Sequence, residues 1–133
     1  MRFAIQTNGV NGHVHASAHE LATELVRRGG QCTSFEDRQL QFVLNLSDME
    51  SPRTFRRKHK SVFVVTLAAH PAADDETIKR NGYRTLIRTF SNLMICLVPN
   101  GNGRLDAHYI TPEVGYYTTP FDADAVCERI API

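Results

Sequence analysis

The segment of residues 3–30 most constrains the fold, because a strand, a turn and a helix follow one another there without a gap. Residues 3–7 are typical of a short buried strand, and the sequence NGVNG after them is typical of a turn. The apolar residues that come next have the spacing of one helix face: Val14, Ala18, Leu21 and Leu25. Gly29 and Gly30 predict where this helix ends, since glycine adopts the left-handed conformation common after helices.

The rest of the chain repeats this alternation and indicates the fold class. Further strands are expected near 41–47, 62–69 and 93–98, with a weaker one at 32–36, and the strand at 62–69 is apolar enough to be central. The turn NGNG predicts a C-terminal antiparallel hairpin, followed by a short helix after Asp122. Residues 1–133 are therefore expected to form one α/β domain, a three-layer Rossmann-like sheet. Its first part is parallel and its C-terminal part is an antiparallel meander.

A second long helix is expected to begin near Asp74, where Asp74, Asp75 and Glu76 suit the positive end of the helix dipole. Its predicted buried stripe consists of Tyr83, Leu86, Ile87 and Phe90. Gly82 interrupts good helix formers, which indicates either a kink or close packing.

Composition excludes several classes of protein. The chain has a net charge of +1, so no overall field attracts it to nucleic acid or membrane. Three widely spaced cysteines predict no disulfide framework and no cysteine zinc site, and Cys96 is expected in the core. Without a signal-peptide pattern or a membrane-length apolar run, we expect a cytoplasmic protein without membrane association.

The glycine turn is the first candidate for ligand binding. A strand that opens into a helix directs backbone N–H groups and the positive end of the dipole toward one point, where phosphates bind. Only Gly9 and Gly12 of a three-glycine dinucleotide fingerprint are present, while Glu36 and Asp37 follow at the distance of a ribose-binding acid. The alternative is that both glycines only shape a turn.

Polar residues at the ends of neighbouring strands extend this candidate site. Ligands of open parallel sheets bind beyond the carboxyl ends of the strands. The predicted ligand-binding set is Thr7, Asn8, Gly9, Gly12, His13, Ser47, Asp48 and His70. We expect an anionic small molecule, of nucleotide or sugar-phosphate type, bound without catalysis or with the help of a partner. An alternative is a small hydrolase or transferase that uses His70 and Asp48.

The histidines His15 and His19 stand four residues apart on the first helix, as metal ligands can, with His13 just before them. The sequence HELATE lacks the second histidine of the HExxH motif, because Thr23 stands in its place. We therefore predict no metal and no cofactor.

Basic residues form a second candidate surface. Nine of the fifteen Lys and Arg residues lie between Arg53 and Arg88. The predicted anion-binding residues are Arg53, Arg56, Arg57, Lys58, Arg80, Arg84 and Arg88, with Phe55 available for stacking. The partner would be an acidic protein or, less favoured because RNA-binding signatures are absent, a nucleic acid. The apolar hairpin 93–119 could also pair with a second copy in a homodimer.

Residues 3–30 resemble the start of the N-terminal Rossmann-like lobe of two-lobed glycosyltransferases. The resemblance is carried by Gly12, His13, Glu24, Leu25, Arg28 and Gly29. The small domain that precedes an ATP-grasp module is equally similar. The resemblance implies the fold alone, since these 133 residues hold no second lobe and transferase activity is not implied.

Overall fold

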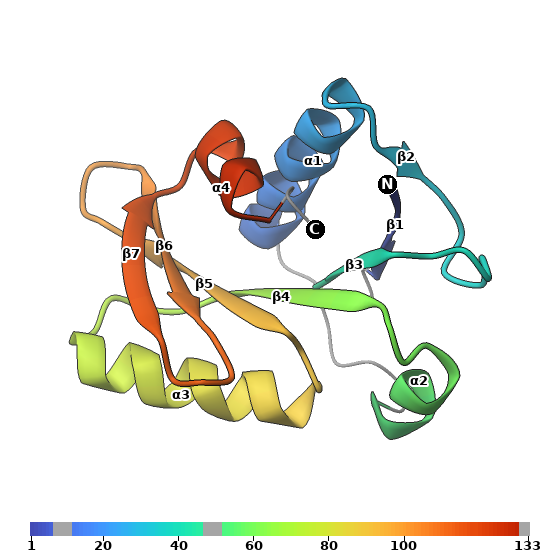
Figure 1. The fold of residues 1–133 in the computed structure, drawn as a ribbon. Helices are drawn as coiled ribbons and strands as arrows, with labels where there is room; N and C mark the ends of the chain where they lie inside the picture. Colours follow the sequence, from blue (N-terminus) through green and yellow to red (C-terminus); the bar gives the residue numbers. More distant parts are fainter. Residues whose placement is uncertain (7–11, 47–51, 131–133) are drawn as a thin grey trace.

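The computed structural model describes residues 1–6, 12–46 and 52–130, without the side chains of residues 12 and 13. The described residues form one sheet in the order β2-β1-β3-β4-β5-β6-β7 (Figure 1). The strands are β1 (Arg2–Gln6), β2 (Gln31–Cys32), β3 (Phe42–Asn45), β4 (Phe63–Ala69), β5 (Leu93–Pro99), β6 (Leu105–Ile110) and β7 (Tyr116–Pro120). The strands β2, β1, β3, β4 and β5 pair in parallel, and β6 and β7 extend the sheet antiparallel. This mixed sheet confirms the predicted fold class.

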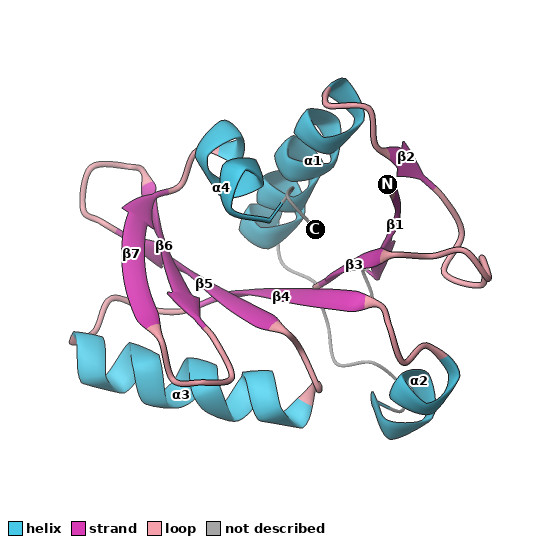
Figure 2. Cartoon of the chain, viewed as in Figure 1, coloured by secondary structure: helices cyan, strands magenta, loops and turns pink. Residues whose placement is uncertain are grey.

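Helices cover both faces of the sheet and complete the three layers (Figure 2). The helices are α1 (Gly12–Arg27), α2 (Pro52–Lys58), α3 (Asp75–Arg88) and α4 (Ala123–Ile130). The pair α1 and α4 packs on one face with a single large apolar cluster. On the other face, α2 and α3 each pack on a smaller cluster of their own. Among the described helices, none combines the length and apolarity needed to cross a bilayer.

The first helix forms as its spacing predicts, with Val14, Ala18, Leu21 and Leu25 buried against the sheet. Its end carries two characteristic hydrogen bonds, from the amide of Gly29 to the carbonyl of Val26 and from the amide of Gly30 to that of Leu25. Gly29 has a φ of 96°, which explains the need for glycine there.

The helix α3 packs differently from the prediction. Its buried residues are Ile78, Gly82 and Leu86, whereas Ile87 and Phe90 are exposed. Ile87 follows Leu86 directly and is rotated by about 100° around the helix, so the two cannot face the sheet together. Gly82 marks close packing, because a Cβ there would lie 2.1 Å from Cδ1 of Ile110.

The predicted strand at 32–36 is much shorter than expected, since β2 contains only Gln31–Cys32. The amide of Thr33 still bonds to the carbonyl of Phe3, after which the chain turns. Asp37 stabilises this turn, because it accepts hydrogen bonds from the amide of Gln39 at 2.9 Å and from Nε of Arg2 at 2.6 Å.

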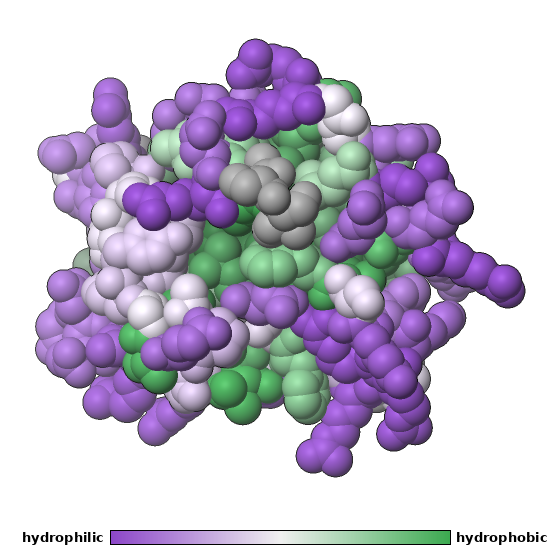
Figure 3. All heavy atoms as spheres, in the orientation of Figure 1, coloured by the Kyte–Doolittle hydropathy of each residue, from purple (hydrophilic) through white to green (hydrophobic). Residues whose placement is uncertain are grey.

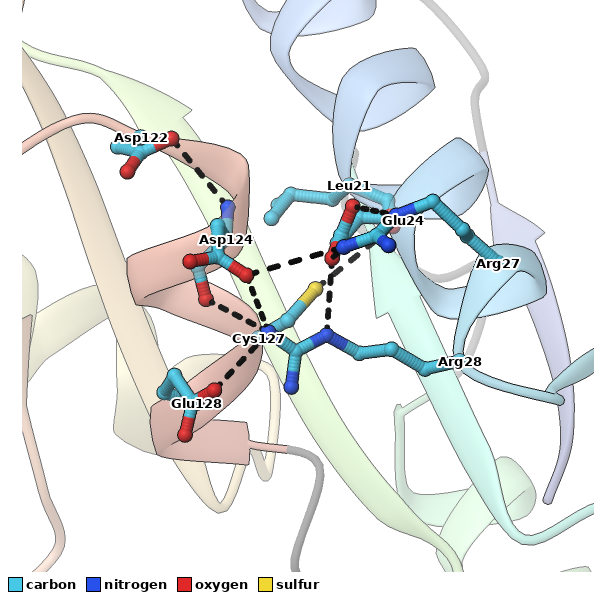
Figure 4. Close-up of polar contacts among 8 residues, drawn as sticks. All are labelled: Leu21, Glu24, Arg27, Arg28, Asp122, Asp124, Cys127 and Glu128. Atoms are coloured by element: carbon cyan, nitrogen blue, oxygen red, sulfur yellow. Dashed lines mark hydrogen bonds and ion pairs between the residues drawn. The ribbon is translucent and has the colours of Figure 1, made fainter.

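Ion pairs join α4 to the end of α1 (Figure 4). The guanidinium of Arg28, just after α1, donates to Glu24 of α1 at 3.0 Å, to Glu128 of α4 at 3.1 Å and to Asp124 of α4. Hydrogen bonds from Arg27 and Arg28 lower the pKa of Glu24 to about 2. The two helices thus stay paired by charge beside their shared apolar contact.

Candidate functional site

The strand order places a change of direction beside β1. The chain leaves β1 toward β2 on one side, and then crosses to β3 on the other side. In doubly wound sheets with the order 2-1-3-4-5, ligands bind in the crevice at this point, beyond the carboxyl ends of the strands. The residues that end β1 and β3 are Gln6 and Asn45, and they are register partners.

A row of polar side chains crosses the sheet at this level. Gln6 pairs with Asn45, and Asn45 pairs with Thr66 of β4, so the three residues stand side by side on neighbouring strands. Asn45 is 0% exposed and Thr66 is 3% exposed. Buried strands of parallel sheets are normally apolar throughout, so polar residues in this row are a departure from the rest of the sheet.

Hydrogen bonds connect the row to the end of α3. The amide of Asn45 donates to Oγ1 of Thr66 at 3.1 Å, and this hydroxyl lies 2.5 Å from Oγ of Ser91. Ser91 lies 2.6 Å from Oγ1 of Thr89, which donates to the carbonyl of Thr85. The network separates the apolar cluster under α2 from the cluster under α3. It provides neutral donors and acceptors that hold the polar row in place.

Most of the predicted ligand-binding residues lie outside the described part of the chain. Thr7, Asn8, Gly9, Ser47 and Asp48 belong to residues 7–11 and 47–51. Gly12 and His13 begin α1, and their side chains are not described. Along the chain, residues 7–11 connect β1 to α1, and residues 47–51 connect β3 to α2.

His70 is the one member of the predicted set whose side chain is described. It follows the end of β4 and is half-buried. Its Nδ1 lies 2.7 Å from the carbonyl oxygen of Pro71, and its Nε2 lies 3.0 Å from Nδ2 of Asn81. These partners fit a neutral ring that donates from Nδ1 and accepts at Nε2. A role for His70 as an acid or base requires Asn81 to release Nε2 first.

A second polar cluster near His70 was not found from the sequence. His108 of β6 is 6% exposed, and its Nδ1 lies 2.6 Å from the hydroxyl of Tyr116. Tyr116 in turn donates to Oδ1 of Asp75 at 3.2 Å. Desolvation lowers the pKa of His108, and the charges of Asp75 and Asp106 oppose this shift. Only the pairing of β6 with β7 and the position of α3 bring these residues together, so spacing in the sequence gives no signal for them.

The basic residues are divided between surface and interior. Arg53, Arg57, Lys58, Arg80, Arg84 and Arg88 are exposed on α2 and α3. Arg56 is used inside the protein, where its guanidinium donates to the carbonyl oxygens of Val62 and Phe90. Phe55 is only 7% exposed and packs in the cluster under α2, so the expected stacking by Phe55 does not occur.

A cavity of about 450 Å³ lies at the C-terminal end of α2 and is lined by Glu36, Arg38, Lys58 and His59. The ring centroid of His59 lies 4.8 Å from that of the buried Phe55. Desolvation and the charge of Lys58 lower the pKa of His59. This hollow contains Lys58 of the predicted anion-binding residues and Glu36, the candidate ribose-binding acid, but no member of the ligand-binding set predicted at the strand ends.

The described residues include no group of three histidine, cysteine or acidic side chains arranged to hold a metal ion. His15 and His19 are both exposed on α1.

Two solved structures share this arrangement over nearly their whole length. The DNA/pantothenate metabolism flavoprotein from Streptococcus pneumoniae aligns with a TM-score of 0.74 and 8% sequence identity, over 99% of this chain and 98% of the other. The C-terminal domain of the coenzyme A biosynthesis bifunctional protein CoaBC aligns with a TM-score of 0.65 and 9% identity, over 98% and 92% of the two chains. No family model and no curated protein sequence matches the chain. The chain therefore shares with these proteins a Rossmann-like fold, and at this identity the likeness extends to the fold alone.

Proposed function

We propose that this protein binds a phosphate-bearing small molecule, of nucleotide or sugar-phosphate type, in the crevice beyond the carboxyl ends of β1 and β3. The ligand is bound without catalysis, or for a reaction that a partner completes. The observation that carries the proposal is the polar row Gln6, Asn45 and Thr66 at the point where the sheet changes direction.

The start of α1 supports an anionic ligand. The helix begins at Gly12 and contains 16 residues, so its dipole is fully developed. Its first turn contains no acidic residue that would occupy the positive end. A phosphate beside the first turn would accept hydrogen bonds from the free backbone N–H groups.

The comparisons support the same class of ligand. The names of the two similar structures refer to a flavoprotein and to coenzyme A biosynthesis. Flavin nucleotides and coenzyme A both carry phosphate groups, so they are suitable probes together with ATP and a nucleotide sugar.

Thermal unfolding of the protein with flavin mononucleotide, ATP, UDP-glucose and coenzyme A tests the proposal. A ligand at 100 times its Kd stabilises a protein by about 2.7 kcal/mol, which is a measurable rise in Tm. We expect such a rise with at least one probe, and a smaller one in Gln6→Leu, which removes the amide from the polar row.

Asn102→Ala is the matched control, because this amide lies in an exposed turn far along the chain from the row. It should respond to the ligand as the wild type does. If none of the four probes raises Tm, or if Gln6→Leu responds as fully as Asn102→Ala, the proposal is wrong.

A further inference from the structure

The cavity at the C-terminal end of α2 is formed by two segments that lie apart in the sequence. Glu36 and Arg38 belong to the turn between β2 and β3, whereas Lys58 ends α2 and His59 follows it. Its volume of about 450 Å³ is within the range of pockets that hold small molecules. Hydrophilic atoms dominate the surface over α2 and over the segment between β2 and β3 (Figure 3). The cavity is thus a polar pocket of ligand size.

Hydrogen bonds fix the turn that carries Glu36 and Arg38. The carboxylate of Asp37, between them, accepts from the amide of Gln39 at 2.9 Å and from Nε of Arg2 at 2.6 Å. Asp37 itself does not line the cavity. Arg2 is the first residue of β1, so the turn lies at the amino end of this strand. The site of the proposed function lies beyond the opposite, carboxyl end.

Aromatic contacts fix the imidazole of His59 at the cavity wall. Its ring centroid lies 4.8 Å from that of the buried Phe55 and 6.4 Å from that of Phe35. The amide of His59 also donates to the carbonyl oxygen of Phe55 at 2.8 Å. Neither ring nitrogen of His59 has a hydrogen-bond partner in the described part of the chain. The ring is therefore held in position, with its nitrogens available to a ligand.

Three charged side chains line the cavity without pairing with one another. Arg38, Lys58 and Glu36 are all exposed, and no ion pair joins any of them to a described residue. Desolvation and the charge of Lys58 lower the pKa of His59, so its ring is neutral at pH 7. The lining then carries two positive charges and a separate negative one. A ligand that matches it carries two negative charges and, at another point, one positive charge.

We propose that this cavity binds a small zwitterion, with a dianionic group at Arg38 and Lys58 and an amine at Glu36. The dianionic group is a phosphate or a pair of carboxylates, which Arg and Lys both bind through charge-assisted hydrogen bonds. A ligand with negative charges alone fits less well, because the Glu36 carboxylate would repel it. This site does not depend on the proposed function, since it lies at the other end of β1.

Two pairs of matched ligands test the proposal: phosphoethanolamine with propyl phosphate, and glutamate with glutarate. Within each pair the anionic groups and the chain length are the same, and only the first compound carries an amine. The imidazole proton signals of His59, assigned with His59→Gln, report binding at constant ionic strength.

We expect a saturable shift of these signals with phosphoethanolamine or glutamate, with a Kd of about 1 mM for ligands of so few atoms. The matching compound without the amine should bind about two- to fivefold more weakly, the contribution of one exposed ion pair. The compound that binds shows whether the dianionic group is a phosphate or a pair of carboxylates.

Variants of the lining residues assign the contacts. Lys58→Gln should weaken binding about tenfold, through the loss of a charge-assisted hydrogen bond. Glu36→Gln should abolish the preference for the ligand with the amine. Arg57→Gln is the matched control, because Arg57 is exposed on α2 beside Lys58 and does not line the cavity. It should bind as tightly as the wild type.

Four results would overturn the proposal. Neither phosphoethanolamine nor glutamate shifts the His59 signals saturably, or the compounds without the amine bind as tightly as their partners. In the third, Glu36→Gln retains the full preference for the amine. In the fourth, Arg57→Gln loses as much affinity as Lys58→Gln, so that the general positive charge of α2 attracts the ligand.

Discussion

At the scale of single residues, Gly82 is a point of close approach between α3 and the sheet. A Cβ at this position would lie 2.1 Å from Cδ1 of Ile110 and 3.0 Å from Sγ of Cys96. Ile110 and Cys96 are both buried, so neither can move into solvent. The absence of a side chain at Gly82 is what allows α3 to pack this closely on β5 and β6.

We therefore expect Gly82→Ala to destabilise the protein by about 1–3 kcal/mol, although alanine is the better helix former. Urea unfolding measures this change. Ile110→Val removes the Cδ1 atom in question, so the double variant should lose less than the sum of the two single variants. Additive losses would mean that the contact with Ile110 is not the cause.

His108 makes stability depend on pH. Its charge and hydrogen bonds are set by Tyr116, Thr118, Asp75, Asp106 and His70. Desolvation lowers its pKa below the ordinary value of 6.5, so the unfolded chain binds a proton more readily than the folded protein does. The stabilisation is complete above about pH 6.5 and is lost as the pH falls toward the folded pKa.

Thermal melting between about pH 7 and 5 measures this dependence, and Tm should fall over that interval. The pKa of His59 is lowered as well, so part of the dependence should survive in His108→Gln. The fall should be clearly smaller in His108→Gln than in the wild type. An unchanged fall would contradict the assignment to His108.

At the scale of elements, the ion pairs of Arg28 hold α4 against α1 (Figure 4). Arg28→Ala should lower Tm by no more than a few degrees, since exposed ion pairs contribute little. It should also speed amide exchange in α4 more than in α3. The difference in Tm should shrink at high salt.

The pH dependence of the Arg28 ion pairs at low pH depends on Glu24. Because its folded pKa is about 2, its contribution is present above the unfolded value and is lost as the pH falls from about 4.5 toward 2. If the difference in Tm between Arg28→Ala and the wild type is as large at pH 2 as at neutral pH, the ion pair with Glu24 is not its cause.

The sequence predicts the elements with strong periodicity and misjudges those that depend on tertiary contacts. The strands near 62–69 and 93–98 and the helix from Val14 are found because long apolar patterns specify them. The strand predicted at 32–36 is replaced by the two-residue strand Gln31–Cys32, because the chain turns around Asp37. On α3, apolar residues alone do not say which of them face the sheet: Leu86 is buried, whereas Ile87, the next residue, is exposed.

In the candidate site too, some features follow from the sequence pattern and others depend on tertiary contacts. The rule that ligands bind beyond strand ends predicts the position of the proposed site from the order of elements alone. The polar row needs the register that aligns Gln6, Asn45 and Thr66, which no local spacing in the chain encodes. The contact between His108 and Tyr116 likewise exists only because β6 pairs with β7.

At the scale of the whole molecule, the sheet ends at β7, whose outer edge has no strand beside it among the described residues. The sequence predicts a homodimer in which a second copy pairs with the hairpin 93–119, which contains this edge. Light scattering should then give twice the chain mass of 14.9 kDa. Thr118→Pro removes an N–H group from β7 and should yield a monomer if this edge forms the contact, while a dimer that survives the change must use another surface.

The central claim is that the crevice beside β1 and β3 binds a phosphate-bearing ligand. Amide chemical shifts of the ¹⁵N-labelled protein during titration with flavin mononucleotide and ATP test it most directly. The account predicts that a saturable change with at least one of them centres on Gln6, Asn45 and the first turn of α1. Changes centred on Arg38 and His59, or no saturable change with either compound, would contradict it.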